Sequence, residues 1–244
     1  MTQIFDRGHH HRAKLGFVLL ATEQTIEENM FRMCPDGVGL HFTRAAIPDS
    51  ITVENLQGQA GDLARAASTL LPDGSLNVIT YACTSGSLVI GEDRVFDELK
   101  KGAPQAKPTS LITSVIRALK QVGARRIAVA TPYLEEINRQ EAVYLENAGF
   151  EVTNIAGLSL EKDSDMIRVR PDYLAEFAVQ SDRRDADALF ISCGALRSID
   201  IIGKLEQRLA KPVICSNQAM MWDMLRLAGI DDRIPGYGRL LADH

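Results

Sequence analysis

The sequence lacks the features that mark several large classes of protein. Cysteine is scarce, with four among 244 residues, and no two are spaced as C-x-x-C. This argues against a zinc knuckle, a thioredoxin-like redox motif and a disulfide framework. Neither G-x-G-x-x-G nor a P-loop pattern occurs, so no nucleotide-binding phosphate loop is indicated. Because no His, Cys, Asp or Glu cluster has the spacing of a metal site, we expect neither a metal nor an organic cofactor.

Basic charge and long apolar runs are also in short supply. The chain has 27 Lys and Arg against 32 Asp and Glu, a net charge of −5. This balance argues against nucleic acid or an anionic membrane as the main partner, because phosphate binding needs a basic surface. No apolar run approaches the length that spans a bilayer, and residues 1–14 contain no apolar core of a secretory signal. We therefore expect a cytoplasmic protein without nucleic-acid or membrane partners.

Short apolar runs alternate with amphipathic segments along the whole chain. Such alternation predicts an α/β fold with parallel sheets. The expected strands are residues 15–22, 38–43, 76–82, 126–131, 150–155, 187–192 and a run ending at 215. The expected helices are residues 25–33, 52–71, 87–100, a segment ending at 123, 134–148, 171–179, 198–209 and 218–228.

The second half of the chain repeats the order of the first. Cys83 and Cys193 each follow a predicted strand, and Ala-Lys-Pro occurs at 106–108 and again at 210–212. The repeat predicts two pseudosymmetric lobes, each a short parallel sheet flanked by helices, with the active site in the cleft between them. We expect one lobe to comprise residues 1–113 and 218–244 and to carry Cys83. The other would comprise residues 114–217 and carry Cys193.

Both cysteines precede small residues and a predicted helix. We expect each sulfur at a helix N-terminus, where backbone N–H groups and the helix dipole lower a thiol pKa. A single cysteine in such a run is more often a small buried hydrophobe, but the repetition favours one site with two thiols. The neighbouring pairs Thr84-Ser85 and Gly194-Ala195 suit a carboxylate cradle, because small residues let a ligand reach the backbone. Without the cysteines, these loops would indicate only tight turns.

Four motifs carry a resemblance to a known family. They are Ala82-Cys83-Thr84-Ser85-Gly86, Thr131-Pro132-Tyr133, Ser192-Cys193-Gly194 and Ser216-Asn217-Gln218-Ala219. At these residues the chain resembles the aspartate/glutamate racemase superfamily, in its maleate cis-trans isomerase and arylmalonate decarboxylase branch. The likeness covers nearly the whole chain and is closest to the ectoine-utilisation proteins A.

The resemblance implies a cofactor-independent enzyme with its site between two lobes. It implies that Cys83 is the nucleophile, that Cys193 is the second catalytic cysteine and that Tyr133 contacts substrate. It also places Thr84, Ser85, Gly194 and Ala195 in the carboxylate-binding loops. Arylmalonate decarboxylases have glycine where this chain has the first cysteine, so the presence of both thiols favours isomerase or racemase chemistry.

Two positions depart from the maleate isomerase pattern. Glu23 aligns with a substrate-binding asparagine, and a second family asparagine falls near Asp163 or Ser164. A carboxylate there would repel a dianion and favour a substrate that bears a nitrogen cation. A simpler interpretation is that Glu23 caps the helix expected from Thr25.

We therefore predict an isomerase or racemase of a small carboxylate, assembled as a homo-oligomer. A Cys83 thiolate could add to an activated alkene and leave after bond rotation, or the two thiols could act as base and acid on opposite faces of a carbon acid. The alternatives are an arylmalonate-type decarboxylase and a sensor that binds a metabolite without turnover.

Overall fold

The computed structural model describes residues 4–244 and contains two parallel four-stranded sheets. Their strand orders, β2-β1-β3-β4 and β6-β5-β7-β8, are the same when the halves are numbered separately. The α/β fold with two similar sheets is therefore confirmed. The strands are β1 (Ala13–Leu20), β2 (Val38–Ala45), β3 (Val78–Tyr81), β4 (Lys107–Ser110), β5 (Arg126–Thr131), β6 (Glu151–Gly157), β7 (Ala188–Ile191) and β8 (Val213–Cys215).

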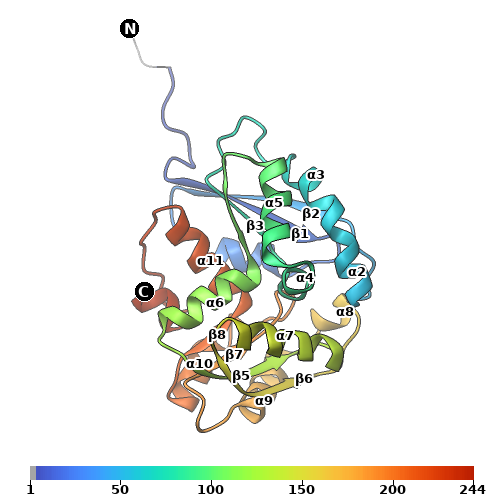
Figure 1. The fold of residues 1–244 in the computed structure, drawn as a ribbon. Coiled ribbons are helices and arrows are strands. Elements are labelled where there is room, and N and C mark those ends of the chain that lie inside the picture. Colours follow the sequence, from blue (N-terminus) through green and yellow to red (C-terminus); the bar gives the residue numbers. More distant parts are fainter. Residues whose placement is uncertain (1–3) are drawn as a thin grey trace.

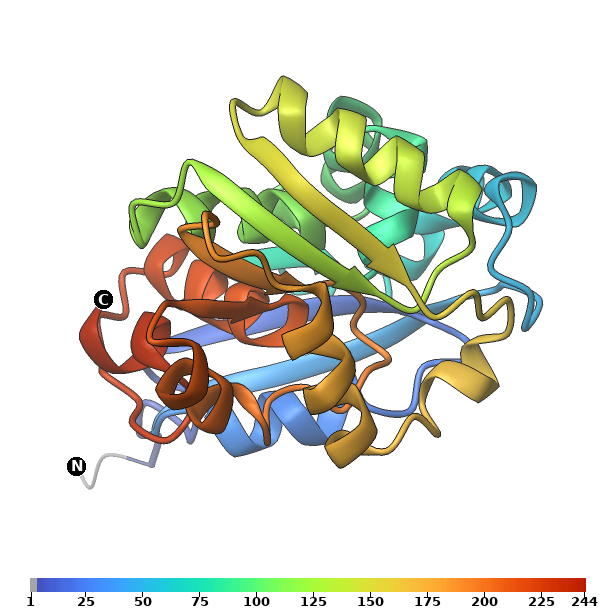
Figure 2. The ribbon, with the colours of Figure 1, turned by 90° about the horizontal axis from the view of Figure 1, so that it is seen from below.

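Helices cover both sheets. Figure 1 shows the first sheet above and the second below, with α4, α6 and α11 between them. In Figure 2 the molecule is seen from the side of the second sheet, and the blue strands of the first lie behind. The helices are α1 (Ile26–Met33), α2 (Val53–Gly58), α3 (Leu63–Ala67), α4 (Thr84–Ile90), α5 (Glu92–Gly102), α6 (Leu111–Gln121), α7 (Glu135–Asn147), α8 (Asp163–Met166), α9 (Pro171–Ser181), α10 (Ile202–Leu209), α11 (Ser216–Leu227) and α12 (Arg239–Asp243).

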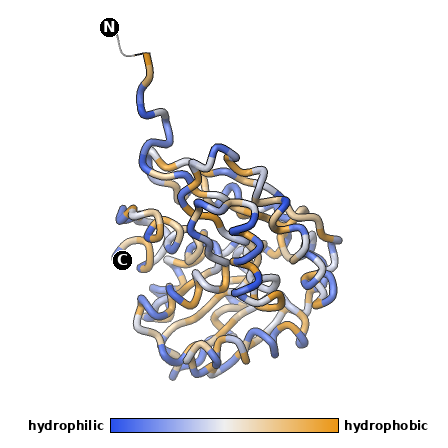
Figure 3. Tube along the Cα trace, turned by 45° about the horizontal axis from the view of Figure 1, so that its top comes forward, coloured by the Kyte–Doolittle hydropathy of each residue, from blue (hydrophilic) through white to orange (hydrophobic). Residues whose placement is uncertain are grey.

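The core consists of the strands and the helix faces that pack on them. Every residue of β3 and β7 is buried, and in β1 only Lys14 is partly exposed. Continuous apolar strands of this kind are typical of parallel sheets with both faces covered. In Figure 3 the hydrophobic segments gather inside the molecule and the segment at residues 4–8 extends away from it. Within residues 4–244, no helix is both long and apolar enough to cross a membrane.

Helix α11 joins the two halves. It follows β8 of the second sheet but packs on α6 and also contacts α1, β3 and β4. The assignment of residues 218–244 to the first lobe stays a proposal, and residues 1–3 of that lobe lie outside the described part. The proposed boundary at residue 113 falls within α6, so the two lobes share a continuous helix there.

Two predicted helices are broken in the structure. The segment 52–71 forms α2, a 3-10 turn (Gln59–Asp62) and α3, because Gly58 and Gly61 weaken a continuous helix. The segment 87–100 belongs to α4 and α5, which begin at Thr84 and Glu92. They are separated by Gly91, whose φ of 91° is incompatible with a helix interior.

Other elements were missed or displaced. Strand β4 was not predicted, since it is short and contains Pro108, which a sheet tolerates at an edge. The predicted helix 198–209 begins only at Ile202, after a loop. Helices α8 and α12 have four and five residues and give no periodic signal.

Candidate active site

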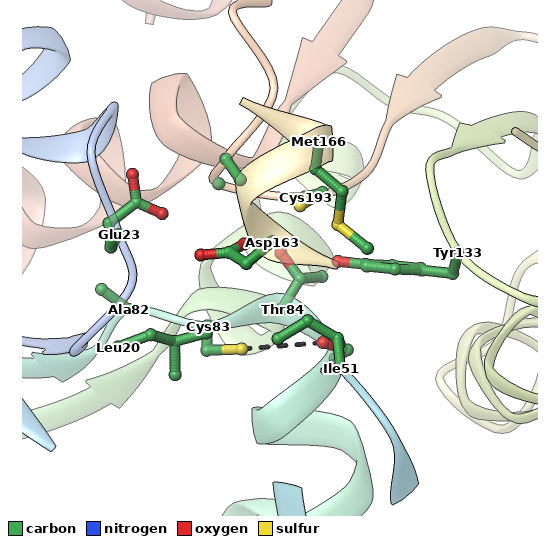
Figure 4. A pocket seen from close by; sticks show the side chains of 13 residues that line it. Leu20, Glu23, Ile51, Ala82, Cys83, Thr84, Tyr133, Asp163, Met166 and Cys193 are labelled. Atoms are coloured by element: carbon green, nitrogen blue, oxygen red, sulfur yellow. Dashed lines mark hydrogen bonds between the residues drawn. The ribbon is translucent and has the colours of Figure 1, made fainter. Parts of the chain in front are cut away.

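One cavity lies at the carboxyl ends of strands from both sheets. All nine site residues predicted from the sequence line it, together with four apolar ones (Figure 4). The nine are Glu23, Cys83, Thr84, Ser85, Tyr133, Asp163, Cys193, Gly194 and Ala195, and the four are Leu20, Ile51, Ala82 and Met166.

Cys83 sits at the end of β3 as the residue that caps α4. Its sulfur accepts a hydrogen bond from the Gly86 N–H at 3.2 Å and lies 3.6 Å from the Ser85 hydroxyl. Tyr81 lies beneath this turn, fully buried, and hydrogen-bonds Gln59. The turn needs glycine at position 86, because a Cβ there would lie 2.2 Å from the Tyr81 hydroxyl. The sequence therefore places the first thiol as predicted, at a helix N-terminus.

Cys193 follows β7 but does not lie at a helix N-terminus, so that prediction was wrong. A loop of small residues separates it from α10, and its φ of 96° lies in a region that favours glycine. The loop is held from outside: Asn217 donates to the Gly194 carbonyl at 2.8 Å, and Thr25 donates to the Ala195 carbonyl at 3.0 Å. Side-chain contacts, rather than a helix dipole, position this thiol.

The expectation of low thiol pKa values was also wrong for the protein without substrate. Burial raises the pKa of Cys83 to about 11, although the Gly86 N–H and the Ser85 hydroxyl act in the opposite direction. Burial also holds the pKa of Cys193 well above its ordinary value. Loss of water around both sulfurs outweighs the helix terminus at Cys83. Burial therefore favours the protonated form of both thiols.

Glu23 both caps a helix and lines the cavity. Its Oε1 accepts hydrogen bonds from the Thr25 and Ile26 N–H groups at the start of α1, the second at 2.9 Å. Burial and the nearby Asp163 raise the pKa of Glu23 to about 7. The two interpretations of this residue are therefore compatible.

Asp163 brings a second carboxyl group from the other half of the chain. Its Oδ2 accepts a hydrogen bond from the Thr22 hydroxyl at 2.7 Å, and burial raises its pKa. In Figure 4 the carboxyl groups of Glu23 and Asp163 point toward each other. The neighbouring Ser164, the other candidate for the position of the family asparagine, hydrogen-bonds Asp49 and does not line the cavity. Two buried acids thus face one another beside two thiols.

Two segments from opposite halves of the chain meet over the cavity. An isolated antiparallel bridge pairs Ser50 with Lys162. Backbone hydrogen bonds of 2.8 and 3.0 Å run in both directions between residues 49–51 and 161–163. We call these paired segments the clasp.

The clasp leaves little space inside. Ile51 and the α8 residue Met166 complete the wall, and about 10 Å³ remains for the centre of a water-sized sphere. A space of that size holds about one water molecule. A small carboxylate is larger than this space, so we expect the wall of the cavity to move when a substrate binds.

Reasoning from sequence missed Ile51 and Met166. Both are apolar residues in irregular or very short elements, and neither carries a pattern that distinguishes them from core residues. Ala82 is the first residue of a motif that was recognised, and Leu20 is the last residue of β1, so their position at strand ends could have identified them.

The cavity wall has acidic groups, hydroxyls and apolar groups but no Lys, Arg or His. In Figure 4 the sulfur of Cys83 lies below the Asp163 and Thr84 side chains and that of Cys193 lies above them. This arrangement can deliver a thiol to two sides of a small bound molecule. Across residues 4–244, no three His, Cys, Asp or Glu side chains are placed to hold a metal ion.

The known proteins that this chain is similar to are arylmalonate decarboxylases and maleate isomerases. A family model for arylmalonate decarboxylase matches residues 41–241. The arylmalonate decarboxylase of Bordetella bronchiseptica is 36% identical over 135 residues, an alignment that covers 54% of this chain and 56% of that protein. The maleate isomerase of Nocardia farcinica is 25% identical over 238 residues, which cover 93% of this chain and 95% of the isomerase.

A solved structure shares the fold. It is that of a cysteine-to-serine mutant of the maleate cis-trans isomerase of Nocardia farcinica with a covalently bound succinylcysteine intermediate. The TM-score is 0.87 at 23% identity, and the match covers 95% of this chain and 99% of that one. The chain therefore belongs to the arylmalonate decarboxylase family, in the branch of the aspartate/glutamate racemase superfamily that includes the maleate isomerases.

Proposed function

We propose that the protein is a cofactor-independent isomerase or racemase that acts on a small carboxylate through Cys83 and Cys193. The observation that carries this proposal is the placement of both thiols on one cavity, at equivalent strand ends of two similar sheets. Proton exchange at two faces of a substrate needs a thiol on each side. Addition of one thiolate with protonation by a second thiol needs two thiols as well.

With an unsaturated substrate, the reaction is an addition followed by elimination. The Cys83 thiolate forms a C–S bond to one alkene carbon, the π electron pair moves to the other carbon, and the Cys193 thiol donates its proton there. Rotation about the new single bond follows. Cys193 then removes a proton, the double bond re-forms and the Cys83 thiolate leaves. The covalent succinylcysteine of the Nocardia farcinica isomerase mutant supports a step of this kind.

With a saturated substrate, the same thiols would exchange protons without a covalent adduct. One thiolate removes the proton beside the carboxyl group, and the opposite thiol protonates the other face of the planar carbanion. The configuration at carbon is inverted and the two cysteines exchange protonation states.

The acidic groups of the cavity favour a substrate with a positively charged nitrogen. Glu23 and Asp163 are 5% and 2% exposed, and no basic side chain lines the cavity to neutralise them. An ammonium or amidinium group beside them would satisfy both carboxylates and would remove a repulsion that opposes thiolate formation. The resemblance to ectoine-utilisation proteins A agrees with such a substrate.

A second candidate is decarboxylation of a malonate. This reaction is favoured by the Bordetella bronchiseptica decarboxylase, which has a higher sequence identity to this chain than the Nocardia farcinica isomerase has. This reaction needs one proton donor after loss of CO2, so it would retain activity without one of the two thiols. Racemisation or alkene isomerisation through both thiols would not.

The test is proton NMR of the enzyme in D2O with a panel of dicarboxylates, malonates and amino-acid derivatives. Wild type is expected to isomerise or racemise one class, and Cys83→Ser and Cys193→Ser to lose at least about 100-fold in kcat. Cys215→Ser is the matched control, because Cys215 is buried but does not line the cavity.

Three results would point elsewhere. Loss of CO2 from a malonate by wild type and by Cys83→Ser would establish the decarboxylase. Binding of a panel member without turnover would indicate a sensor. Full activity in both cysteine variants would eliminate the thiol mechanism.

A further inference from the structure

The first residue of α11 contacts both cysteine loops. Ser216 is fully buried, and its Oγ accepts a hydrogen bond from the Cys193 N–H at 3.0 Å. The same Oγ lies 3.0 Å from Oγ1 of Thr84, the residue after Cys83. One hydroxyl therefore joins the loop after β7 to the start of α4, although Ser216 does not line the cavity itself.

The Ser216 hydroxyl can take part in both hydrogen bonds at once. A serine hydroxyl has one proton and two lone pairs, and one lone pair of Ser216 is taken by the Cys193 N–H. Its proton and its second lone pair remain, so either hydroxyl can be the donor between Ser216 and Thr84. If Ser216 donates to Thr84, the Thr84 proton is left to point into the cavity, where it can bind an anionic oxygen.

The bond to Cys193 has a second consequence. Cys193 has a φ of 96°, which a residue other than glycine adopts only when its surroundings hold it there. Its N–H is fixed by Ser216, while the carbonyl of Gly194 is fixed by the adjacent Asn217. The N-terminus of α11 thus sets the backbone conformation that presents the second thiol.

We propose that Ser216 is a positioning residue that coordinates the two halves of the site: it holds the Cys193 backbone and orients the Thr84 hydroxyl as a donor to a substrate carboxylate. The part concerning Thr84 rests on the proposed function, because it requires a carboxylate substrate. The part concerning Cys193 does not. The two parts predict different kinetic effects.

The test is a double-mutant cycle. Ser216→Ala is expected to raise KM about 5-fold through Thr84 and to lower kcat about 10-fold through Cys193. Thr84→Val, which keeps the shape but removes the hydroxyl, should mainly raise KM. In the Thr84→Val background, Ser216→Ala should change KM by less than about 2-fold and still lower kcat.

Two variants separate positioning from general stability. Ser198→Ala removes another fully buried hydroxyl from the loop after Cys193, which donates to the nearby Leu196 carbonyl, and should leave kcat and KM within about 2-fold. Thr84→Ser retains the hydroxyl and should therefore have a KM close to that of wild type, without most of the increase expected in Thr84→Val. Equal effects of Ser216→Ala and Ser198→Ala, or an undiminished KM effect in the Thr84→Val background, would overturn the proposal.

A readout without substrate separates this proposal from the proposed function. The rate of Cys193 alkylation by iodoacetamide, measured by mass spectrometry against Cys34 in the same sample, should rise at least about 3-fold in Ser216→Ala as the held backbone relaxes. It should not change in Ser198→Ala. If wild type turns over nothing, the proposed function fails, and this rate still decides whether Ser216 holds Cys193: an unchanged rate would reject it.

Discussion

The Ser164 hydroxyl donates a hydrogen bond of 2.6 Å to Oδ2 of Asp49, and the Ser164 N–H donates another of 2.9 Å to Oδ1. These two bonds join a loop of the first half of the chain to the start of α8 in the second. They reinforce the clasp over the cavity. Hydrogen bonding by Ser164 also lowers the pKa of Asp49.

Asp49→Ala should favour the open clasp. We expect kcat/KM to fall about 10-fold, because the cavity no longer closes around the substrate, and Ser164→Ala to have a smaller effect since one bond to the N–H remains. Asp165→Ala, at an exposed neighbour, is the control. Because the pKa of Asp49 is lowered in the closed form, closure should be strongest above the ordinary Asp pKa and weaken as pH falls below it. Stopped-flow binding would measure closure, and identical kinetics in Asp49→Ala and Asp165→Ala would contradict this role.

Glu141 should make stability depend on pH. It is completely buried, accepts a hydrogen bond of 2.6 Å from the Ser192 hydroxyl, and burial raises its pKa to about 7. A raised carboxyl pKa stabilises the folded protein fully below pH 4.5, and this contribution is lost as pH rises to about 7. Its size is on the order of 3 kcal/mol.

The measurement is urea unfolding of wild type and Glu141→Gln from pH 4.5 to 8. The glutamine variant should lose less stability as pH rises, and Glu136→Gln, at an exposed residue of the same helix, should follow wild type. Parallel curves for wild type and Glu141→Gln would show that Glu141 does not titrate in this range.

Gly86→Ala should damage the site through Tyr81. A Cβ at this position would clash with the Tyr81 ring and hydroxyl, so we expect a loss of about 1–3 kcal/mol in stability and at least about 10-fold in kcat. Gly203→Ala is the matched control, because a Cβ there meets nothing within 4 Å; it should stabilise α10 by about 0.5–1 kcal/mol. Thermal unfolding and turnover of both variants decide the matter. A Gly86→Ala protein with wild-type activity would contradict the described packing.

The charge on Glu23 should decide which substrate is preferred as pH changes. Its pKa of about 7 means that it ionises across the neutral range. For a substrate with a nitrogen cation, kcat/KM should rise as pH increases through 7, and for a dianion such as maleate it should fall. Glu23→Gln should remove both trends, whereas Glu27→Gln, at a partly exposed residue of α1 that pairs with Arg44, should keep them. A wild-type profile that is the same for both substrate types would reject selection by charge.

The sequence located most of the cavity because strand ends leave a local signal. The apolar runs of the predicted strands end at Cys83 and Cys193, so the polar residues come directly after the strands. Parallel strands bring their carboxyl ends to the same edge of a sheet. Because both halves have the same order of elements, the repeat also predicted that Cys193 and its loop lie opposite Cys83. Glu23 and Asp163 came only from the family resemblance.

The remaining features depend on contacts between distant segments. Ile51 and Met166 reach the cavity because residues near 50 pair with residues near 162, which no local pattern reveals. The thiol pKa values depend on how completely the surrounding residues bury the two sulfurs. The conformation of Cys193 depends on Ser216, which is far along the chain and buried.

The two sheets share their strand order, yet the positions that follow their first strands differ: Glu23 lies after β1 and Tyr133 after β5. A molecule in the cavity therefore meets a thiol on each side but a carboxyl group toward one end and a phenol toward the other. Under the proposed function, we expect a substrate with two different ends to bind in one orientation, so that each cysteine meets the same face. The duplicated scaffold would then supply the two thiols, and its departures from symmetry would set the orientation of the substrate.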